Sequence, residues 1–273
     1  MSGRRRSLRL PARMALAAAF LAGAAPSHAG EAAREGAEEA SRPLETKNIF
    51  GFTAGTDIGP DQDRELELET NLAFGKRTGA YAVGAQAVTL EVNPNDWVEI
   101  DTGLIGSFHR VSGVEGLDDG RGATFGGVET KFSVVLAHRS PRTPVGVTVS
   151  IEPEWSRVDE SGRVGWSFGA ETRLIVDAEP IPERDEPFRF GAKQVVLGAE
   201  AGYFRAYGRL AADDFLGHAL YAGPTAYVHF NDTVFLAAAV STQVAGVATG
   251  VGRALDLVNF PRRRVKMTIG VEF

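Results

Sequence analysis

The chain has 273 residues, of which 44% are apolar, 9% aromatic and 23% charged, and it contains no cysteine. The lack of cysteine excludes disulfides, thiolate metal sites and a cysteine nucleophile. The first 29 residues carry five arginines and no acidic residue, so without them the formal charge falls from −6 to −11, which argues against a nucleic-acid partner. No run of 18 apolar residues occurs beyond the N-terminus, which excludes a helical membrane protein but not a β-barrel, whose apolar residues alternate with polar ones.

The N-terminus has the three parts of a secretory signal peptide. Arginines between residues 4 and 9 precede a short apolar stretch at 14–25, and Ser27-His28-Ala29 places small residues at the −3 and −1 positions of a cleavage site. We therefore expect residues 1–29 to be a signal peptide; an amphipathic helix or an uncleaved anchor is the alternative. Residues 30–47 are acidic, rich in alanine and glutamate and free of aromatics, which predicts a flexible, solvated segment before a single domain at 48–273.

From about residue 64 onward, apolar and polar residues alternate with the period of a β-strand. This pattern predicts ten strands, at 65–74, 80–92, 98–108, 128–136, 145–155, 164–174, 193–205, 218–230, 233–244 and 265–273. Strands in globular sheets are usually about 5–6 residues long, whereas tilted strands that cross a bilayer need about 9–11. The length of these segments favours a membrane barrel over a soluble sandwich.

The predicted fold class is all-β: one antiparallel up-and-down transmembrane β-barrel of about ten strands, with twelve as the alternative count. A soluble periplasmic β-sandwich or lipocalin-like binder is a second alternative, because alternation is expected there too. Two features conflict with the predicted register. Pro153 and Pro224 fall inside strands, where each removes a ladder donor, and Phe125 and Tyr221 have the parity of the interior.

Two stretches resemble known outer-membrane proteins. The terminal strand VKMTIGVEF, which ends on Phe273, resembles the C-terminal signature of bacterial outer-membrane β-barrels. The stretch GPTAYVHFNDTVFLAAAV (223–240) resembles the penultimate hairpin of the barrels of the phenol meta-cleavage-pathway transporter type. The first resemblance implies a location in the outer membrane of a Gram-negative bacterium, and recognition of Phe273 by the barrel-assembly machinery. Neither stretch carries a catalytic motif, and together they imply a porin-like, transport-type or structural protein of the outer membrane.

The parity that faces away from lipid is rich in acidic residues. The predicted lumen-lining residues are Glu67, Glu69, Glu99, Asp101, Glu129, Lys131, Glu152, Glu171, Arg173, Glu200 and Lys266. An excess of carboxylates on this face predicts either a small channel that favours cationic solutes or an interior filled by salt-bridged side chains with a structural role.

The predicted outer loops contain the remaining candidate sites. Asp118-Asp119 and Asp213-Asp214, with His109 and His218 nearby, resemble the omptin proteases in composition and rough location but not in spacing, so a rim-active hydrolase is kept as an alternative. The last strand begins with three arginines, Arg262, Arg263 and Arg264, whose guanidinium groups suit the phosphates of lipopolysaccharide. We therefore expect lipopolysaccharide, together with membrane lipid, as a partner of this chain. No motif for a cofactor, a metal or a catalytic nucleophile is found.

Overall fold

The computed structural model describes residues 47–273, apart from 140–142, 144, 159–163, 179–191, 193, 208–213, 232 and 252–253. The expected signal peptide and most of the expected flexible segment lie outside this range. The described residues form ten strands: β1 (Arg64–Phe74), β2 (Ala80–Asn95), β3 (Val98–Ser112), β4 (Gly120–Ala137), β5 (Val145–Val158), β6 (Val164–Ala178), β7 (Gln194–Tyr207), β8 (Phe215–His229), β9 (Val234–Ala248) and β10 (Arg263–Glu272). The all-β class and the count of ten strands are therefore confirmed. None of the described residues belongs to a helix that is long and apolar enough to cross a membrane.

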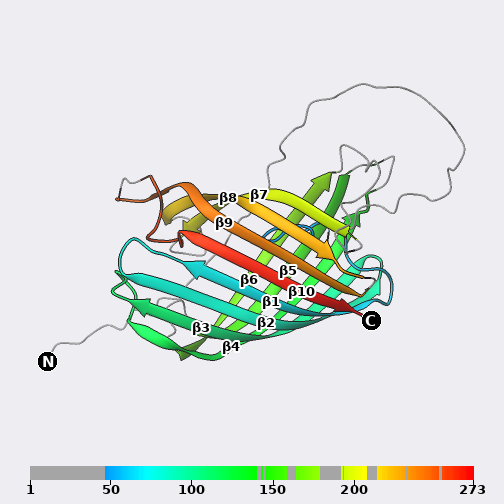
Figure 1. The fold of residues 1–273 in the computed structure, drawn as a ribbon, viewed down its shortest axis with the longest axis horizontal. Coiled ribbons are helices and arrows are strands. Elements are labelled where there is room, and N and C mark those ends of the chain that lie inside the picture. Colours follow the sequence, from blue (N-terminus) through cyan, green and yellow to red (C-terminus); the bar gives the residue numbers. More distant parts are fainter. Residues whose placement is uncertain are drawn as a thin grey trace, which may run out of the picture.

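The strands form one antiparallel, up-and-down sheet in which the first and last strands are neighbours. Its order is β6-β5-β4-β3-β2-β1-β10-β9-β8-β7, and the β1–β10 ladder runs from Glu65 opposite Glu272 to Phe74 opposite Arg263. Figure 1 shows the curl of the sheet, with β5 and β6 passing behind the layer that holds β1 and β10. Among the described residues no ladder joins β6 to β7, so these two strands are the edges of the sheet.

The two faces of the sheet have the reverse of the polarity of a soluble protein. Large apolar side chains are exposed on the outer face, including Leu104 (61%), Trp166 (66%) and Leu197 (78%). The inner face buries charged and polar residues, such as Glu65, Glu91 and Thr148. This inversion is the arrangement of a transmembrane β-barrel, which presents an apolar band to lipid and polar groups to its interior.

A bulge explains why Phe125 departs from the predicted register. Ile105 pairs with Gly127, but the next residue of β3, Gly106, pairs with Phe125, so Gly126 is an extra residue in β4. One extra residue reverses the alternation beyond it. Phe125 is consequently 41% exposed on the outer face rather than directed inward. Gly127 in this bulge has a backbone φ of +153°, which residues with a Cβ rarely adopt.

Both prolines lie where the ladder is interrupted without a change in register. Between β4 and β5, pairing is found at Glu129–Glu154 and at Phe132–Ile151 but not between them, where Pro153 lies. Between β8 and β9 the same kind of gap encloses Pro224. Proline has no backbone N–H to donate, and each of these prolines lies at a point where the ladder to the neighbouring strand has no pairs. Neither proline marks a bulge, because the register is the same on both sides of the gap.

The C-terminal residue provides the first test of this architecture. The Phe273 side chain is 69% exposed, and its backbone N–H donates to the carbonyl of Arg64 at the start of β1. We expect Phe273→Ser to reduce assembly into the membrane much more than export, because the terminal aromatic is what the assembly machinery is expected to recognise. Heat-modifiable mobility on a gel measures the folded fraction, with Phe230→Ser as a control at another exposed aromatic. An unchanged folded fraction for Phe273→Ser would remove the assembly role.

Candidate functional site

A polar cavity of about 570 Å³ lies against the inner face of β1–β6 and β10. It extends along most of the length of the strands, from Glu99 and Thr148 near one end to His109 and Val158 near the other. Among the described residues, the wall includes nine carboxylates and five cationic side chains: Asp57, Glu67, Glu69, Glu91, Glu99, Asp101, Glu129, Glu152 and Glu154, with Lys47, Lys131, Arg173, Arg264 and Lys266.

Part of the interior is occupied by the chain itself. Residues 47–62, which we call the inner segment, precede β1. Most of residues 47–58 line the cavity inside the curled sheet, and residues 60–62 are exposed before β1 begins. Ile49 packs against Tyr227, Phe235 and neighbouring apolar groups of β8 and β9. Gly51 lies so close to Ala239 of β9 that a Cβ at this position would overlap it. The inner segment therefore backs onto the β8–β9 side and forms part of the cavity wall.

The inner segment also bonds to both edge strands of the sheet. Glu200 on β7 accepts hydrogen bonds from the backbone N–H groups of Gly51, Phe52 (3.0 Å) and Thr53 (3.3 Å). Asp177 on β6 accepts one from the N–H of Thr56 at 2.9 Å and one from its hydroxyl at 2.8 Å. Residues 51–56 thus connect β7 to β6, the two strands between which no ladder is described.

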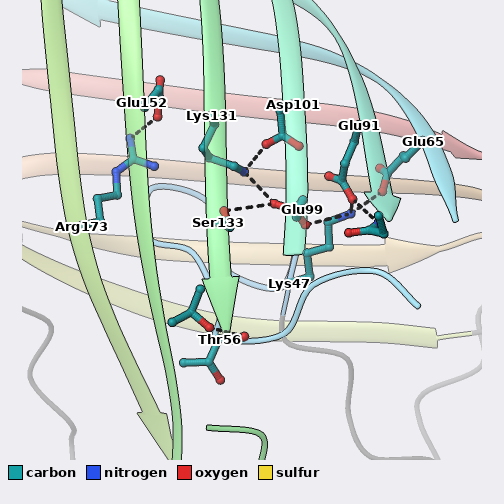
Figure 2. Close-up of polar contacts among 12 residues, drawn as sticks. Lys47, Thr56, Glu65, Glu91, Glu99, Asp101, Lys131, Ser133, Glu152 and Arg173 are labelled. Atoms are coloured by element: carbon teal, nitrogen blue, oxygen red, sulfur yellow. Dashed lines mark hydrogen bonds and ion pairs between the residues drawn. The ribbon is translucent and has the colours of Figure 1, made fainter. Parts of the chain in front are cut away.

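Lys47 anchors the start of the inner segment in a cluster of carboxylates (Figure 2). Its Nζ lies 2.8 Å from Glu65 of β1, pairs with Glu91 of β2 and is 3.9 Å from Glu99 of β3. The Lys47 side chain is 8% exposed, and those of the three glutamates are 1–3% exposed. Burial alone favours the neutral amine, but three buried carboxylates lie around this Nζ and favour its charged form. Lys47 is therefore held as a cation.

Lys131 of β4 extends this cluster along the sheet. Its Nζ lies 3.1 Å from Glu99 and pairs with Asp101, so Glu99 is shared between Lys131 and Lys47 (Figure 2). The Ser133 hydroxyl donates to Glu99 at 3.4 Å. The four carboxylates Glu65, Glu91, Glu99 and Asp101 therefore surround two ammonium groups, which leaves an excess of formal negative charge.

Farther along the cavity, pairing is partial. Arg173 contacts Glu171 at 2.7 Å and Glu152 at 3.2 Å, and Lys266 contacts Glu69 at 2.8 Å. Three other wall carboxylates have no ion-pair partner among the described residues: Glu67, Glu129 and Glu154. Among the described residues, Glu129 accepts a single hydrogen bond, a long one of 3.4 Å from the Thr89 hydroxyl.

The structure places nine of the eleven predicted lumen residues on the wall of this cavity: Glu67, Glu69, Glu99, Asp101, Glu129, Lys131, Glu152, Arg173 and Lys266. Glu171 lies beside Arg173, and Glu200 holds the inner segment. Two charged residues of the site, Glu91 and Lys47, were not predicted from the sequence. Glu91 lies in a weakly alternating strand, and Lys47 ends a segment whose composition predicted solvation; the structure buries it instead.

Arg264 is a correction to the predicted arginine cluster. Its guanidinium lies 4.5 Å from the ring centroid of Phe52, 4.9 Å from that of Phe204 and 5.6 Å from that of Tyr221. Alternation turns this side chain inward, so Arg264 is not available to lipopolysaccharide, whereas Arg262 and Arg263 are exposed. Tyr221, whose parity predicted the interior, is 2% exposed and donates its hydroxyl to the carbonyl of Pro261.

The residues considered for a rim hydrolase are distributed over separate elements. His109 is on β3 and His218 on β8, and four strands separate β3 from β8 in the sheet. Asp119 accepts a hydrogen bond from the N–H of Gly113 at 2.7 Å, which orders its own loop. Asp213 lies outside the described residues. These positions provide no assembled acid–base site among the described residues.

Comparison with known proteins found no matching family model and no matching curated protein. Among solved structures, the fold is similar to one described as the COG4313 outer membrane channel from Pseudomonas putida F1, with a TM-score of 0.46, 10% identity and coverage of 80% of this chain and 98% of that one. It also matches the outer membrane protein OprG from Pseudomonas aeruginosa, with a TM-score of 0.21, 8% identity and coverage of 80% and 99%.

Proposed function

We propose that this chain is a passive channel of the bacterial outer membrane that favours small cationic solutes. The observation that carries the proposal is the cavity along β1–β6, whose wall holds more carboxylates than cationic groups. Charge on the wall of a narrow path selects ions of the opposite sign. Glu67, Glu129 and Glu154 supply negative charge that no described ion pair neutralises.

Outer-membrane location is supported by features of the chain itself. The exposed apolar residues of the outer face need lipid around them. The N-terminal pattern predicts export, and the alternating last strand ends on an aromatic. In the proposed orientation, the start of β1 and the end of β10 face the periplasm. This orientation puts the exposed Arg262 and Arg263 at the outer rim, where we propose that they contact lipopolysaccharide phosphates.

The charge excess leads to a specific expectation for selectivity. Replacing Glu129 and Glu154 with glutamine removes two negative charges and leaves side-chain volume almost unchanged, so cation preference should fall without loss of the folded barrel. The measurement is the zero-current potential of refolded protein in a planar bilayer with a KCl gradient. Glu115→Gln is the matched control, because Glu115 pairs with Arg77 in an exposed loop away from the cavity. An equal shift for the control and the double variant would contradict the role of the wall charges.

A structural role with a filled interior is the second candidate. It is favoured by the ion pairs that Lys131, Arg173 and Lys266 make with acidic residues, because each of these pairs joins two adjacent strands on the inner face. If this role is correct, Glu129→Gln should change stability while the folded wild-type protein carries no current.

A further inference from the structure

The cluster around Lys47 has the composition of a cation site that already contains a cation. Glu65, Glu91 and Glu99 come from three adjacent strands and converge on one ammonium group, which belongs to the start of the inner segment rather than to the sheet. Lys131 lies 3.1 Å from Glu99 and pairs with Asp101, so two ammonium groups face the four carboxylates of Glu65, Glu91, Glu99 and Asp101 and do not balance their charge. A divalent ion would balance the cluster better than an ammonium group does.

The spacing of the oxygen atoms also fits a divalent ion. Ligand oxygens of Glu91, Glu99 and Asp101 lie within 4.8 Å of one another, as do those of Glu65, Glu67 and Glu91. Two oxygens that each bind Ca²⁺ at about 2.3–2.6 Å can be separated by no more than about 5 Å, so either set can share one ion. Carboxylate oxygens are the ligands that Ca²⁺ prefers.

Polar atoms in this cluster remain without partners. Glu99 is 3% exposed, and its Oε2 makes no hydrogen bond, although it faces the Lys47 Nζ at 3.9 Å. The fully buried Asn93 donates its amide to Glu91 at 3.1 Å but leaves its own carbonyl oxygen unpaired. Asp101 also has one buried oxygen without a hydrogen bond. A buried oxygen without a partner costs free energy, and an ion that coordinates several ligands would remove this cost where one ammonium group does not.

We propose that the carboxylates of Glu91, Glu99 and Asp101 form a divalent-cation site in which the Lys47 ammonium, which contacts Glu91 and Glu99, is a tethered, competing occupant. Ca²⁺ entering the site displaces Lys47 and so detaches the first anchor of the inner segment from the wall of the sheet. The exchange involves no covalent step: the ammonium group leaves with its proton and is solvated as the ion takes its place. This inference does not depend on whether the interior conducts.

Removing the Lys47 ammonium group should increase the affinity of the site for Ca²⁺. In Lys47→Met, Ca²⁺ should bind about tenfold or more tightly than in the wild type, because the ion no longer displaces a bound cation. Calorimetry of refolded, detergent-solubilised protein measures this affinity. Lys266→Met is the matched control, since it removes an equal charge from a pair with Glu69 elsewhere on the wall. Equal affinity in Lys47→Met and wild type, or an equal gain in both variants, would overturn the proposal.

Folding of the variant provides a second readout. If Lys47→Met folds poorly in chelator, Ca²⁺ should restore the folded, heat-modifiable species, and adding Glu91→Gln should abolish that rescue. Failure to fold at every Ca²⁺ concentration would contradict the site.

Displacement can also be tested with Lys47 in place. The chain has no cysteine, so Asn48→Cys introduces a single thiol beside Lys47. Ca²⁺ should increase the rate of maleimide labelling at residue 48 by several-fold, and Na⁺ at equal ionic strength should not. A labelling rate that is insensitive to Ca²⁺ would show that the ion does not displace Lys47.

Discussion

Replacing Leu104 with arginine should lower the free energy of unfolding by about 2–4 kcal/mol, the cost of a cation on the lipid face of a barrel near the bilayer midplane. Leu104 lies in the middle of β3 and is 61% exposed on the outer face. In a soluble protein the same exposed position would tolerate arginine, so the substitution separates lipid from water as the surroundings of this face. Urea unfolding of protein refolded into lipid vesicles measures the change.

The same strand offers a matched control for depth. Ser112 is exposed at the end of β3, beside the naturally outward-facing Arg110. Because the cost of arginine falls to about 0–1 kcal/mol near the interface, Ser112→Arg should leave stability almost unchanged. Equal losses at 104 and 112, or no loss at either, would contradict the assignment of this face to lipid.

Lys47→Met should also be strongly destabilising in the presence of chelator. Removing one partner of a buried ion pair typically costs about 3–5 kcal/mol, since the remaining charges stay buried without compensation. Here the charges left behind are those of Glu65 and Glu91, which are 1% and 2% exposed. Urea unfolding should show the loss, together with faster proteolysis of the inner segment.

The control for this substitution is Lys266→Met. Lys266 and Glu69 are each 26% exposed, so water screens the charge that remains and the loss should be clearly smaller. If both variants lose the same stability, Lys47 is not a special anchor of the inner segment.

The sequence was sufficient to predict the strands because their pattern is local. Alternation along segments such as 265–273 or 98–108 depends only on which residues face lipid, and all ten predicted strands are present in the structure, most of them extended by a few residues. The acidic face followed from the same parity. The Gly126 bulge could not be foreseen, because an extra residue changes the pairing without changing the composition.

The position of the inner segment could not be predicted from the sequence, for a different reason. Its contacts join residues far apart in the chain, such as Gly51 with Glu200 and Thr56 with Asp177, and none has a periodic signal. Lys47 looks in sequence like the end of a solvated tail, but three carboxylates of the sheet hold it inside. Arg264 was similarly assigned to the rim, whereas its contacts with the rings of Phe52 and Tyr221 place it inside.

The most direct test of the central claim is the single-channel behaviour of the wild-type protein. Refolded protein, shown to be folded by its heat-modifiable mobility, is inserted into a planar bilayer with a KCl gradient. The acidic cavity along β1–β6 predicts discrete current steps whose zero-current potential has the sign of a cation-selective path. Folded protein that carries no current, or a zero-current potential of the anion-selective sign, would contradict the proposed function.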